Sequence, residues 1–255
     1  MKIIIPMAGH SRRFSNAGYT VPKPFIEING HTMIERVCWM FHPADEFIFV
    51  CNKQHLSNPK FHQILKDITP HYQIISAEAH DLGPVYSVLL GEDAIKDKTQ
   101  PIIVSYCDFL VEWNYRQFLL KAAHYDGALA VFRGFHPASF GDTFYAYIKA
   151  NEHREMLELK EKSSYTNDRA SEYASTGIYY WESWTMFRKY AEEVMKNKPV
   201  GLSEYYCSLL FNPMVAAGHR VCLHEVDKFI CWGTPEDLDE YFFWSRFFNQ
   251  TQIAP

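Results

Sequence analysis

The chain has 255 residues, of which 47% are hydrophobic and 22% charged, and its formal net charge is −5. A chain of this length can bury a large core as one domain, and its weakly acidic balance provides no broad positive surface for nucleic acid. No apolar stretch approaches the ~20 residues of a membrane span, and the six cysteines lie mostly in apolar runs without a Cys-x-x-Cys pair. We therefore expect a cytoplasmic protein that binds neither nucleic acid nor a membrane.

Short apolar runs alternate with helical patterns through the first half of the chain. The apolar runs predict strands over Lys2–Pro6, Glu46–Cys51, Tyr72–Ser76, Ile102–Ser105 and Ala128–Phe132. Helical patterns lie near Thr32–Phe41, Lys60–Ile68, Val85–Ala94 and Tyr115–Tyr125. Thr32 and Glu35 have the spacing of a capping box. This alternation predicts an α/β fold with a mostly parallel mixed sheet and helices on both faces.

The second half of the chain has a different order of elements. Strands are predicted over Thr143–Lys149, Met156–Lys160 and Tyr173–Trp181, and helices over Trp184–Lys196 and Glu204–Ala217. A closing helix begins at Pro235 and carries six aromatic residues, too many for one narrow stripe. These aromatic side chains either pack against the sheet or form a partner surface, which leaves a homo-oligomer open. Without a repeat or linker, we expect a single domain.

The stretch from Ile3 to Lys23 carries the strongest chemical signal. A short apolar run leads into the small residues Ala8 and Gly9, then into Arg12 and Arg13, and after a polar loop into Lys23. Small residues let the backbone approach a polyphosphate, arginine can bind phosphate through two N–H groups, and lysine adds a mobile charge. The glycine spacing fits neither a P-loop nor a dinucleotide-binding fingerprint. The stretch therefore predicts a nucleoside triphosphate site of another kind.

The run from Ala8 to Phe14, followed by Pro22 and Lys23, resembles the phosphate loop and the Pro-Lys pair of the sugar-phosphate nucleotidyltransferases, also called nucleoside-diphosphate-sugar pyrophosphorylases. The resemblance implies a Rossmann-like (GT-A-like) fold and Mg²⁺-dependent transfer of a nucleotidyl group from an NTP to a sugar 1-phosphate. Arg13 would contact the β- and γ-phosphates, and Lys23 would neutralise the α-phosphate and the incoming phosphate. Ser11 stands where the family has glycine, and Arg12 where it has serine or threonine; Arg12 would help to bind the phosphates or point to solvent.

Asp108 ends an apolar run and is the predicted magnesium ligand. A carboxylate at the carboxyl end of a strand, facing a triphosphate, suits Mg²⁺, although an aspartate there can also cap the next segment. The position resembles the family's Gly-Asp motif, with Cys107 in place of glycine. The family's second metal aspartate falls at Cys231 in this chain. Asp227, four residues earlier, would replace it only if the strand bends or bulges.

The segment from Leu82 to Val88 resembles the turn that faces the nucleoside in this family, with Gly83 at the turn. The family's glutamine, which reads a pyrimidine edge, is missing here. Glu78 lies in that region, and because a carboxylate accepts hydrogen bonds from an amino group, cytosine or guanine would suit it better than thymine.

The acceptor-binding residues are expected in the second half of the chain. Glu161 and Lys162 resemble the family's Glu-Lys pair, in which glutamate holds a sugar hydroxyl and lysine the sugar phosphate. Thr176 and Gly177 match the family's Asn-Thr-Gly-Ile-Tyr segment, and Glu204 either binds a hydroxyl or caps a helix. These matches divide the domain into a nucleotide-binding half, residues 1–141, and an acceptor-binding half, residues 142–255.

The sequence therefore predicts a nucleotidyltransferase whose product is an NDP-sugar-type precursor of cell-surface glycan. A second hypothesis keeps the reaction and makes the acceptor a non-sugar phosphate in a cytidylyltransferase. A third is an inactive homologue that senses nucleotide sugars, which the departures at Ser11, Arg12 and Cys231 motivate. A glycosyltransferase with a related framework is disfavoured, because Pro22-Lys23 has no role there and no Asp-x-Asp is present.

Overall fold

The first apolar run forms β1 (Lys2–Met7), which lies inside a nine-stranded sheet. The computed structural model describes residues 1–197 and 201–250. β1 pairs in parallel with β4 (Glu46–Asn52) on one side and with β6 (Ile102–Ser105) on the other, and β4 continues to β5 (Tyr72–Ala77). These four strands begin where the sequence predicts them. Each ends within one residue of the prediction.

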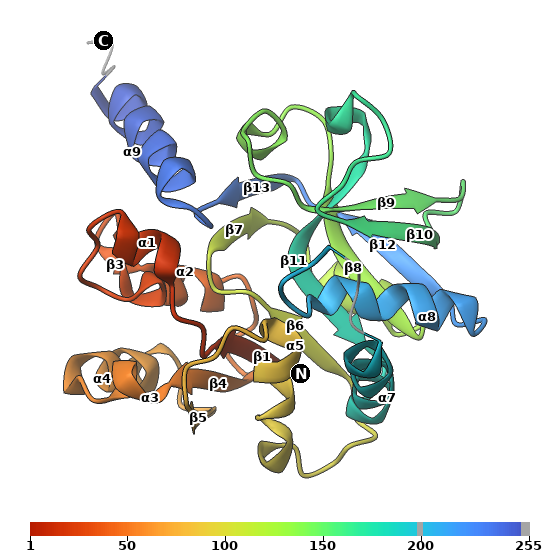
Figure 1. The fold of residues 1–255 in the computed structure, drawn as a ribbon, viewed down its shortest axis with the longest axis horizontal. Coiled ribbons are helices and arrows are strands. Elements are labelled where there is room, and N and C mark those ends of the chain that lie inside the picture. The colour runs from red at the N-terminus through yellow and green to blue at the C-terminus, as the bar shows by residue number, and fades with distance from the viewer. Residues whose placement is uncertain (198–200, 251–255) are drawn as a thin grey trace.

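The remaining strands make the sheet mixed. β11 (Tyr173–Trp181) runs antiparallel to β6 and also pairs with two further strands, β8 (Gly127–Phe132) and β9 (Ala146–Ala150). β10 (Met156–Glu161) pairs with β9, and β12 (Val221–Glu225) runs parallel to β8. In Figure 1, β9 and β10 lie at the opposite end of the sheet from β5. The α/β fold class predicted from the sequence is confirmed.

Helices cover both faces of this sheet. Ile3 and Ile5 point into one apolar cluster and Ile4 into the other, as alternation along a strand requires. The helices whose apolar side chains join the first cluster are α2 (Met33–Cys38), α4 (Pro59–Ile68) and α6 (Tyr115–Ala122). Those that join the second are α5 (Pro84–Leu89), α7 (Trp184–Lys196) and α8 (Phe211–Ala216). The predicted capping box is present at the start of α2.

Several short elements were not predicted. They are α1 (Arg12–Asn16), α3 (Lys53–Leu56), β2 (Glu27–Ile28), β3 (His31–Thr32), β7 (Phe109–Glu112), β12 and β13 (Lys228–Cys231). β7 and β13 form a separate antiparallel pair with Phe109 opposite Cys231. The Trp232 N–H then donates to the carbonyl of Asp108 at 2.8 Å. This pair brings the C-terminal part of the chain to the end of β6.

The predicted helix from Glu204 to Ala217 begins later than expected. Residues Cys207–Leu210 form a 3-10 turn and only then does α8 begin. The backbone of Tyr205 is already engaged, because its N–H donates to Leu82 O at 3.0 Å and its carbonyl accepts from Val85 N–H at 3.1 Å. Pro213 lacks the N–H that a helix running in from Glu204 would need at that position. The prediction of Glu204 as a helix start is therefore wrong.

The closing helix, α9 (Pro235–Gln250), extends away from the sheet in Figure 1. Its first turns pack on α1, the β2–β3 hairpin and α2 rather than on the sheet, through Leu238, Tyr241 and Phe242. The exposed aromatic side chains are Phe243, Trp244, Phe247 and Phe248. Within the described part of the chain, no helix combines the length and apolar character needed to cross a membrane. All six cysteines are free, and five of them are buried.

Candidate active site

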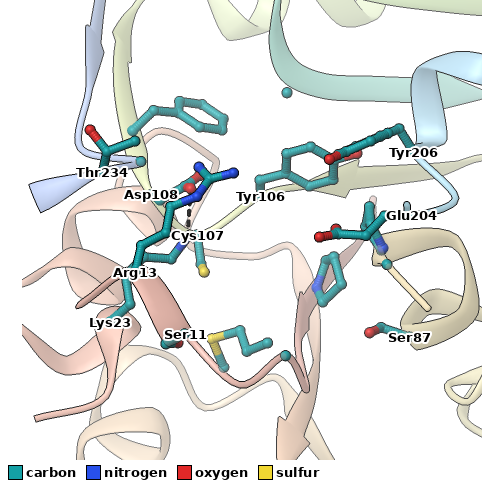
Figure 2. A pocket seen from close by; sticks show the side chains of 18 of the residues that line it. Ser11, Arg13, Lys23, Ser87, Tyr106, Cys107, Asp108, Glu204, Tyr206 and Thr234 are labelled. Carbon is teal, nitrogen blue, oxygen red and sulfur yellow. Dashed lines mark hydrogen bonds and ion pairs between the residues drawn. The ribbon is translucent and has the colours of Figure 1, made fainter. Parts of the chain in front are cut away.

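The carboxyl ends of β1 and β6, two neighbouring parallel strands, open into a cavity of about 550 Å³. This is the edge at which open α/β sheets bind their ligands. The predicted site residues that line it are Gly9, Arg12, Arg13, Lys23, Gly83, Asp108, Glu161, Lys162, Thr176, Gly177 and Glu204. Residues from both halves of the chain thus share one cavity, whose interior is shown in Figure 2.

The loop after β1 places its two arginines in different surroundings. Ser11 precedes α1 in the left-handed conformation, with φ 54° and ψ 33°, which glycine adopts at least cost. The Arg13 side chain extends into the cavity beside Asp108 in Figure 2. Arg12 donates instead to Asp81 at 2.6 Å in an exposed ion pair. Arg13 is therefore the better placed of the two to bind an anion in the cavity.

Lys23 and Asp108 form an ion pair at the centre of the phosphate end. Lys23 starts a 3-10 turn after Pro22, and Asp108 follows β6. The Lys23 Nζ donates to Asp108 Oδ2 at 2.7 Å (Figure 2), and each side chain is only 21% exposed. Burial alone would lower the pKa of the Lys23 ammonium, but the Asp108 carboxylate more than offsets burial and the pKa is raised. Lys23 therefore stays charged.

A second carboxylate, Asp237, faces the same space from the start of α9. A Cβ placed on Gly233 would lie 3.3 Å from Asp108 Oδ2 and 3.9 Å from Asp237 Oδ2. Asp237 Oδ2 accepts hydrogen bonds from the backbone N–H of Thr234 at 3.2 Å and from its hydroxyl at 2.9 Å. The Cys231 thiol also donates to it, at 3.5 Å. This carboxylate was not predicted, because α9 meets β6 only through the β7–β13 pairing.

The residues around Asp108 fit a magnesium ion held mainly by substrate. Across residues 1–197 and 201–250, no three His, Cys, Asp or Glu side chains are grouped to hold a metal ion. Burial raises the pKa of Cys107 to about 12 and raises that of Cys231 as well, so both are neutral thiols. Mg²⁺ commonly takes one or two carboxylates and completes its shell with water and phosphate oxygens. Asp108 together with a triphosphate meets that requirement, whereas a site made of protein ligands alone does not.

Three of the predicted site residues do not line the cavity. Asp227 is exposed in the turn between β12 and β13, where its N–H donates to Glu112 O at 2.9 Å, so no bend brings it to Asp108. The Glu78 side chain is 76% exposed and pairs with Lys53 at 2.9 Å. The base preference inferred from Glu78 thus loses its structural support. Ala8 is fully buried beneath the loop.

The turn at Gly83 forms a wall of the cavity together with the segment that precedes α8. Gly83 has φ 89°, and a Cβ there would lie 2.8 Å from both Glu204 Cβ and the backbone nitrogen of Tyr205. Only glycine fits this backbone conformation and this close approach. The close approach positions Glu204 on the same side of the cavity as Ser87, as Figure 2 shows.

His80 and Ser87 add a polar pair to this wall. Their Nε2 and Oγ atoms are 2.9 Å apart, and His80 Nδ1 accepts from the N–H of Leu82 at 3.2 Å. Burial lowers the pKa of His80. In the neutral ring Nδ1 is the acceptor, so the proton is on Nε2 and is donated to Ser87. The Ser87 hydroxyl hydrogen is then available to a ligand.

The opposite end of the cavity carries a buried carboxyl and a lysine. The Ser208 hydroxyl donates to Glu161 Oε2, and burial raises the pKa of Glu161 despite that hydrogen bond. Lys162 Nζ donates to the carbonyl of Phe144 at 2.6 Å and lies 5.5 Å from the ring centre of Tyr206. Lys162 is exposed, so an anionic group could replace its contact with this carbonyl at little cost.

Gly177 and Tyr106 shape the space between the two ends. Gly177 has φ 101°, and a Cβ there would lie 3.0 Å from the ring of Phe109 and 3.1 Å from the ring of Tyr106. The neighbouring Thr176 hydroxyl donates to Ala130 O at 3.0 Å, so its polar atom is already used within the protein. Tyr106 lies between the phosphate end and Tyr206 in Figure 2. Its ring is the surface that a bound molecule in mid-cavity would contact.

Sequence reasoning missed Tyr106, Tyr206, His80 and Ser87. Tyr106 could have been found, because it precedes Cys107 and Asp108 at the same strand end. His80 and Ser87 belong to a turn and a helix seven positions apart, and their pairing leaves no local pattern. Tyr206 reaches the cavity because the Tyr205 backbone is bound to the Gly83 turn.

Comparison with known proteins places this geometry in a family context. A family model described as nucleotidyl transferase matches residues 2–223. A search of curated proteins finds no significant match.

Three solved structures with a similar fold are nucleotidyltransferases by their descriptions. A nucleoside-diphosphate-sugar pyrophosphorylase from Vibrio cholerae RC9 is 22% identical, with a TM-score of 0.79 and coverage of 94% of this chain and 99% of that chain. An inositol-1-phosphate CTP transferase from T. maritima is 16% identical, with a TM-score of 0.70 over 100% of this chain and 97% of that chain. A UDP-glucose pyrophosphorylase complexed with UDP-glucose is 18% identical, with a TM-score of 0.71 over 96% and 98%. At these identities the likeness shows the fold alone.

Proposed function

The chain belongs to the nucleotidyl transferase family, and we propose that it transfers a nucleotidyl group from an NTP to a sugar 1-phosphate or a similar phosphorylated small molecule. Pyrophosphate leaves, and the product is an NDP-sugar-type precursor for cell-surface glycan. The observation that carries this proposal is the cavity at the ends of β1 and β6, where Arg13, Lys23 and Asp108 face Glu161 and Lys162. One end suits a triphosphate and the other a second phosphorylated molecule.

The chemistry requires charge stabilisation and positioning. The acceptor phosphate attacks the α-phosphate of the NTP in line, the new P–O bond forms, and the bond to pyrophosphate breaks with its electrons on the leaving group. Because the nucleophile is already an anion, no general base is needed. Arg13 would bind the leaving phosphates and Lys23 the α-phosphate, while Lys162 holds the acceptor phosphate. Mg²⁺, held by Asp108 and the phosphates, would neutralise charge on the leaving pyrophosphate.

The test is a turnover screen. The protein is incubated with Mg²⁺ and each of ATP, CTP, GTP, UTP and dTTP, together with sugar 1-phosphates or cyclic and linear polyol phosphates. Pyrophosphate release and the product mass are measured. One NTP and acceptor pair should give both signals. Ligand-stabilised melting without pyrophosphate from any pair would favour the nucleotide-sugar sensor instead, and a polyol product would make the enzyme a transferase to a non-sugar acceptor.

Two substitutions tie this turnover to the cavity. Lys23→Ala and Asp108→Ala should each lower kcat by roughly 10²–10³, or about 3–4 kcal/mol of charge stabilisation. Lys53→Ala is the matched control, because Lys53 is an exposed lysine paired outside the cavity. Near-normal kcat in a folded Lys23→Ala protein would remove the central claim.

A further inference from the structure

The carboxylate that the proposed function assigns to a divalent ion already has a cation in the free protein. Lys23 Nζ lies 2.7 Å from Asp108 Oδ2, and both side chains are largely buried. The Lys23 ammonium thus already donates a hydrogen bond to this carboxylate at the point where a metal ion would bind. A divalent ion approaching Asp108 would therefore meet a positive charge bound to the same carboxylate.

The charged groups around this ion pair balance one another. Asp237 is the other carboxylate facing this space, and its Oδ2 already accepts hydrogen bonds from Thr234, Thr143 and Cys231. Lys23 and Arg13 contribute two positive charges here, and Asp108 and Asp237 contribute two negative ones. The free protein therefore offers little net attraction to a divalent ion at this point.

A triphosphate changes the balance. Its phosphate oxygens carry several negative charges, and Arg13 is placed to draw them toward the cavity. Lysine is a point charge on a flexible four-carbon stem, so Lys23 can exchange the Asp108 oxygen for a phosphate oxygen without a backbone change. Asp108 then becomes available, and the phosphates supply the oxygen ligands that a magnesium site needs beyond one carboxylate.

We propose that Lys23 closes the cation site of the free protein and that the nucleotide opens it by drawing the lysine onto its phosphates. The divalent ion and the nucleotide then bind together, and each raises the affinity of the protein for the other by the same factor. Lys23 in this role controls access to Asp108 before any chemistry begins. The inference rests on the proposed function for the identity of the two ligands, but it concerns binding and not turnover.

The experiment measures Mn²⁺ binding to the nucleotide-free protein, using the electron paramagnetic resonance signal of free Mn²⁺. Wild type should bind Mn²⁺ weakly. Lys23→Gln should lower the Mn²⁺ Kd by at least about tenfold, within the 5–150-fold range typical of coupled sites. Lys23→Arg keeps the positive charge and should bind as weakly as wild type. The double variant Lys23→Gln with Asp108→Asn should lose the gained binding, which locates the ion at Asp108.

Lys53→Gln, which removes an exposed lysine outside the cavity, is the control and should leave the Mn²⁺ Kd unchanged. Thermal melting of each variant checks that it is folded. Equal Mn²⁺ affinity in wild type and folded Lys23→Gln would overturn the inference, as would a gain that survives loss of Asp108. If no NTP is turned over while Lys23→Gln gains Mn²⁺, the proposed function fails and the closed cation site stands. Turnover without that gain supports the proposed function and overturns the closed cation site.

Discussion

Arg12 and Arg13 are neighbours in the chain, but only the guanidinium of Arg13 points into the cavity. Arg12 is bound to Asp81 on the exposed rim, at 2.6 Å, whereas Arg13 extends beside Asp108 (Figure 2). Two adjacent residues on a short helix point in different directions, so the sequence alone could not say which would bind phosphate. Asp81, the partner of Arg12, is 69 residues away in the sequence, and this contact distinguishes Arg12 from Arg13.

Removal of Arg13 should therefore damage the reaction far more than removal of Arg12. Arg13→Ala should lower kcat/KM for the NTP by about 10², because a charge-assisted contact with the phosphates is lost. Arg12→Ala should change kcat/KM by less than about threefold, since an exposed ion pair contributes little. Steady-state kinetics with the NTP found in the turnover screen measures both. Equal losses in the two variants would contradict the assignment.

Ser11 shows why a glycine would suit this loop. Its φ of 54° lies in the left-handed region, which costs a residue with a side chain about 1–2 kcal/mol. Glycine avoids that cost, but it loses more conformational entropy on folding than a residue with a side chain, by about 0.5–1 kcal/mol. Ser11→Gly should therefore raise the free energy of unfolding by about 0.5–1 kcal/mol, measured by urea denaturation. Ser15→Gly, inside α1, should lower it by about 0.5 kcal/mol; a loss at both positions would refute the strain at Ser11.

At the scale of elements, a sequence motif predicted the local structure correctly when all of its interacting residues lay within a few positions of one another. The capping box of Thr32 and Glu35 forms as predicted, since both partners lie on one turn of chain. The Asn29-Gly30 hairpin was missed, although both residues have positive φ, 48° and 83°, as an Asn-Gly turn favours. The start of α8 was misplaced because the Tyr205 backbone pairs with the Gly83 turn, far away in sequence.

That contact between the Gly83 turn and the segment before α8 supports a further prediction. Gly83→Ala would strain a φ of 89° and push a methyl group to 2.8 Å from Glu204 Cβ. It should lower the free energy of unfolding by about 2 kcal/mol or more and raise KM for the NTP. Gly18→Ala is the control, because Gly18 also has positive φ but no atom within 4 Å of its Cβ position. It should cost about 1 kcal/mol and leave KM unchanged; the same loss in both variants would exclude a specific close approach.

At the scale of the whole molecule, partly buried histidines make stability depend on pH. Burial lowers the pKa of four of them: His55, His80, His136 and His224. The Nδ1 atoms of His80 and His136 accept backbone N–H groups, which a protonated ring cannot do. Below about pH 6.5 the unfolded chain binds protons that the folded chain resists. Their contribution to stability is thus present above that pH and is lost as pH falls.

The free energy of unfolding should therefore be lower at pH 5.5 than at pH 7.5. The raised pKa of Glu161 makes the folded protein more stable as pH falls. This single carboxyl opposes the combined effect of the four histidines. Urea denaturation at both pH values tests this, provided the m-value is constant. His136→Gln should reduce the pH dependence, whereas exposed His153→Gln should not. Greater stability at pH 5.5 than at pH 7.5 would contradict the prediction.

The elements of the fold and several site residues could be inferred from the chain because their signals are local. Periodicity marks β1, β4 and β6. Gly9 and Asp108 follow β1 and β6 within three residues, and Lys23 directly follows Pro22. Residues that meet through distant pairing could not be inferred in this way. Burial of apolar faces and the β7–β13 register bring Asp237 near Asp108, while Glu78 pairs with Lys53 outside the cavity. Strand register and competition for ion partners depend on the whole packed chain, so such contacts leave no pattern in the sequence.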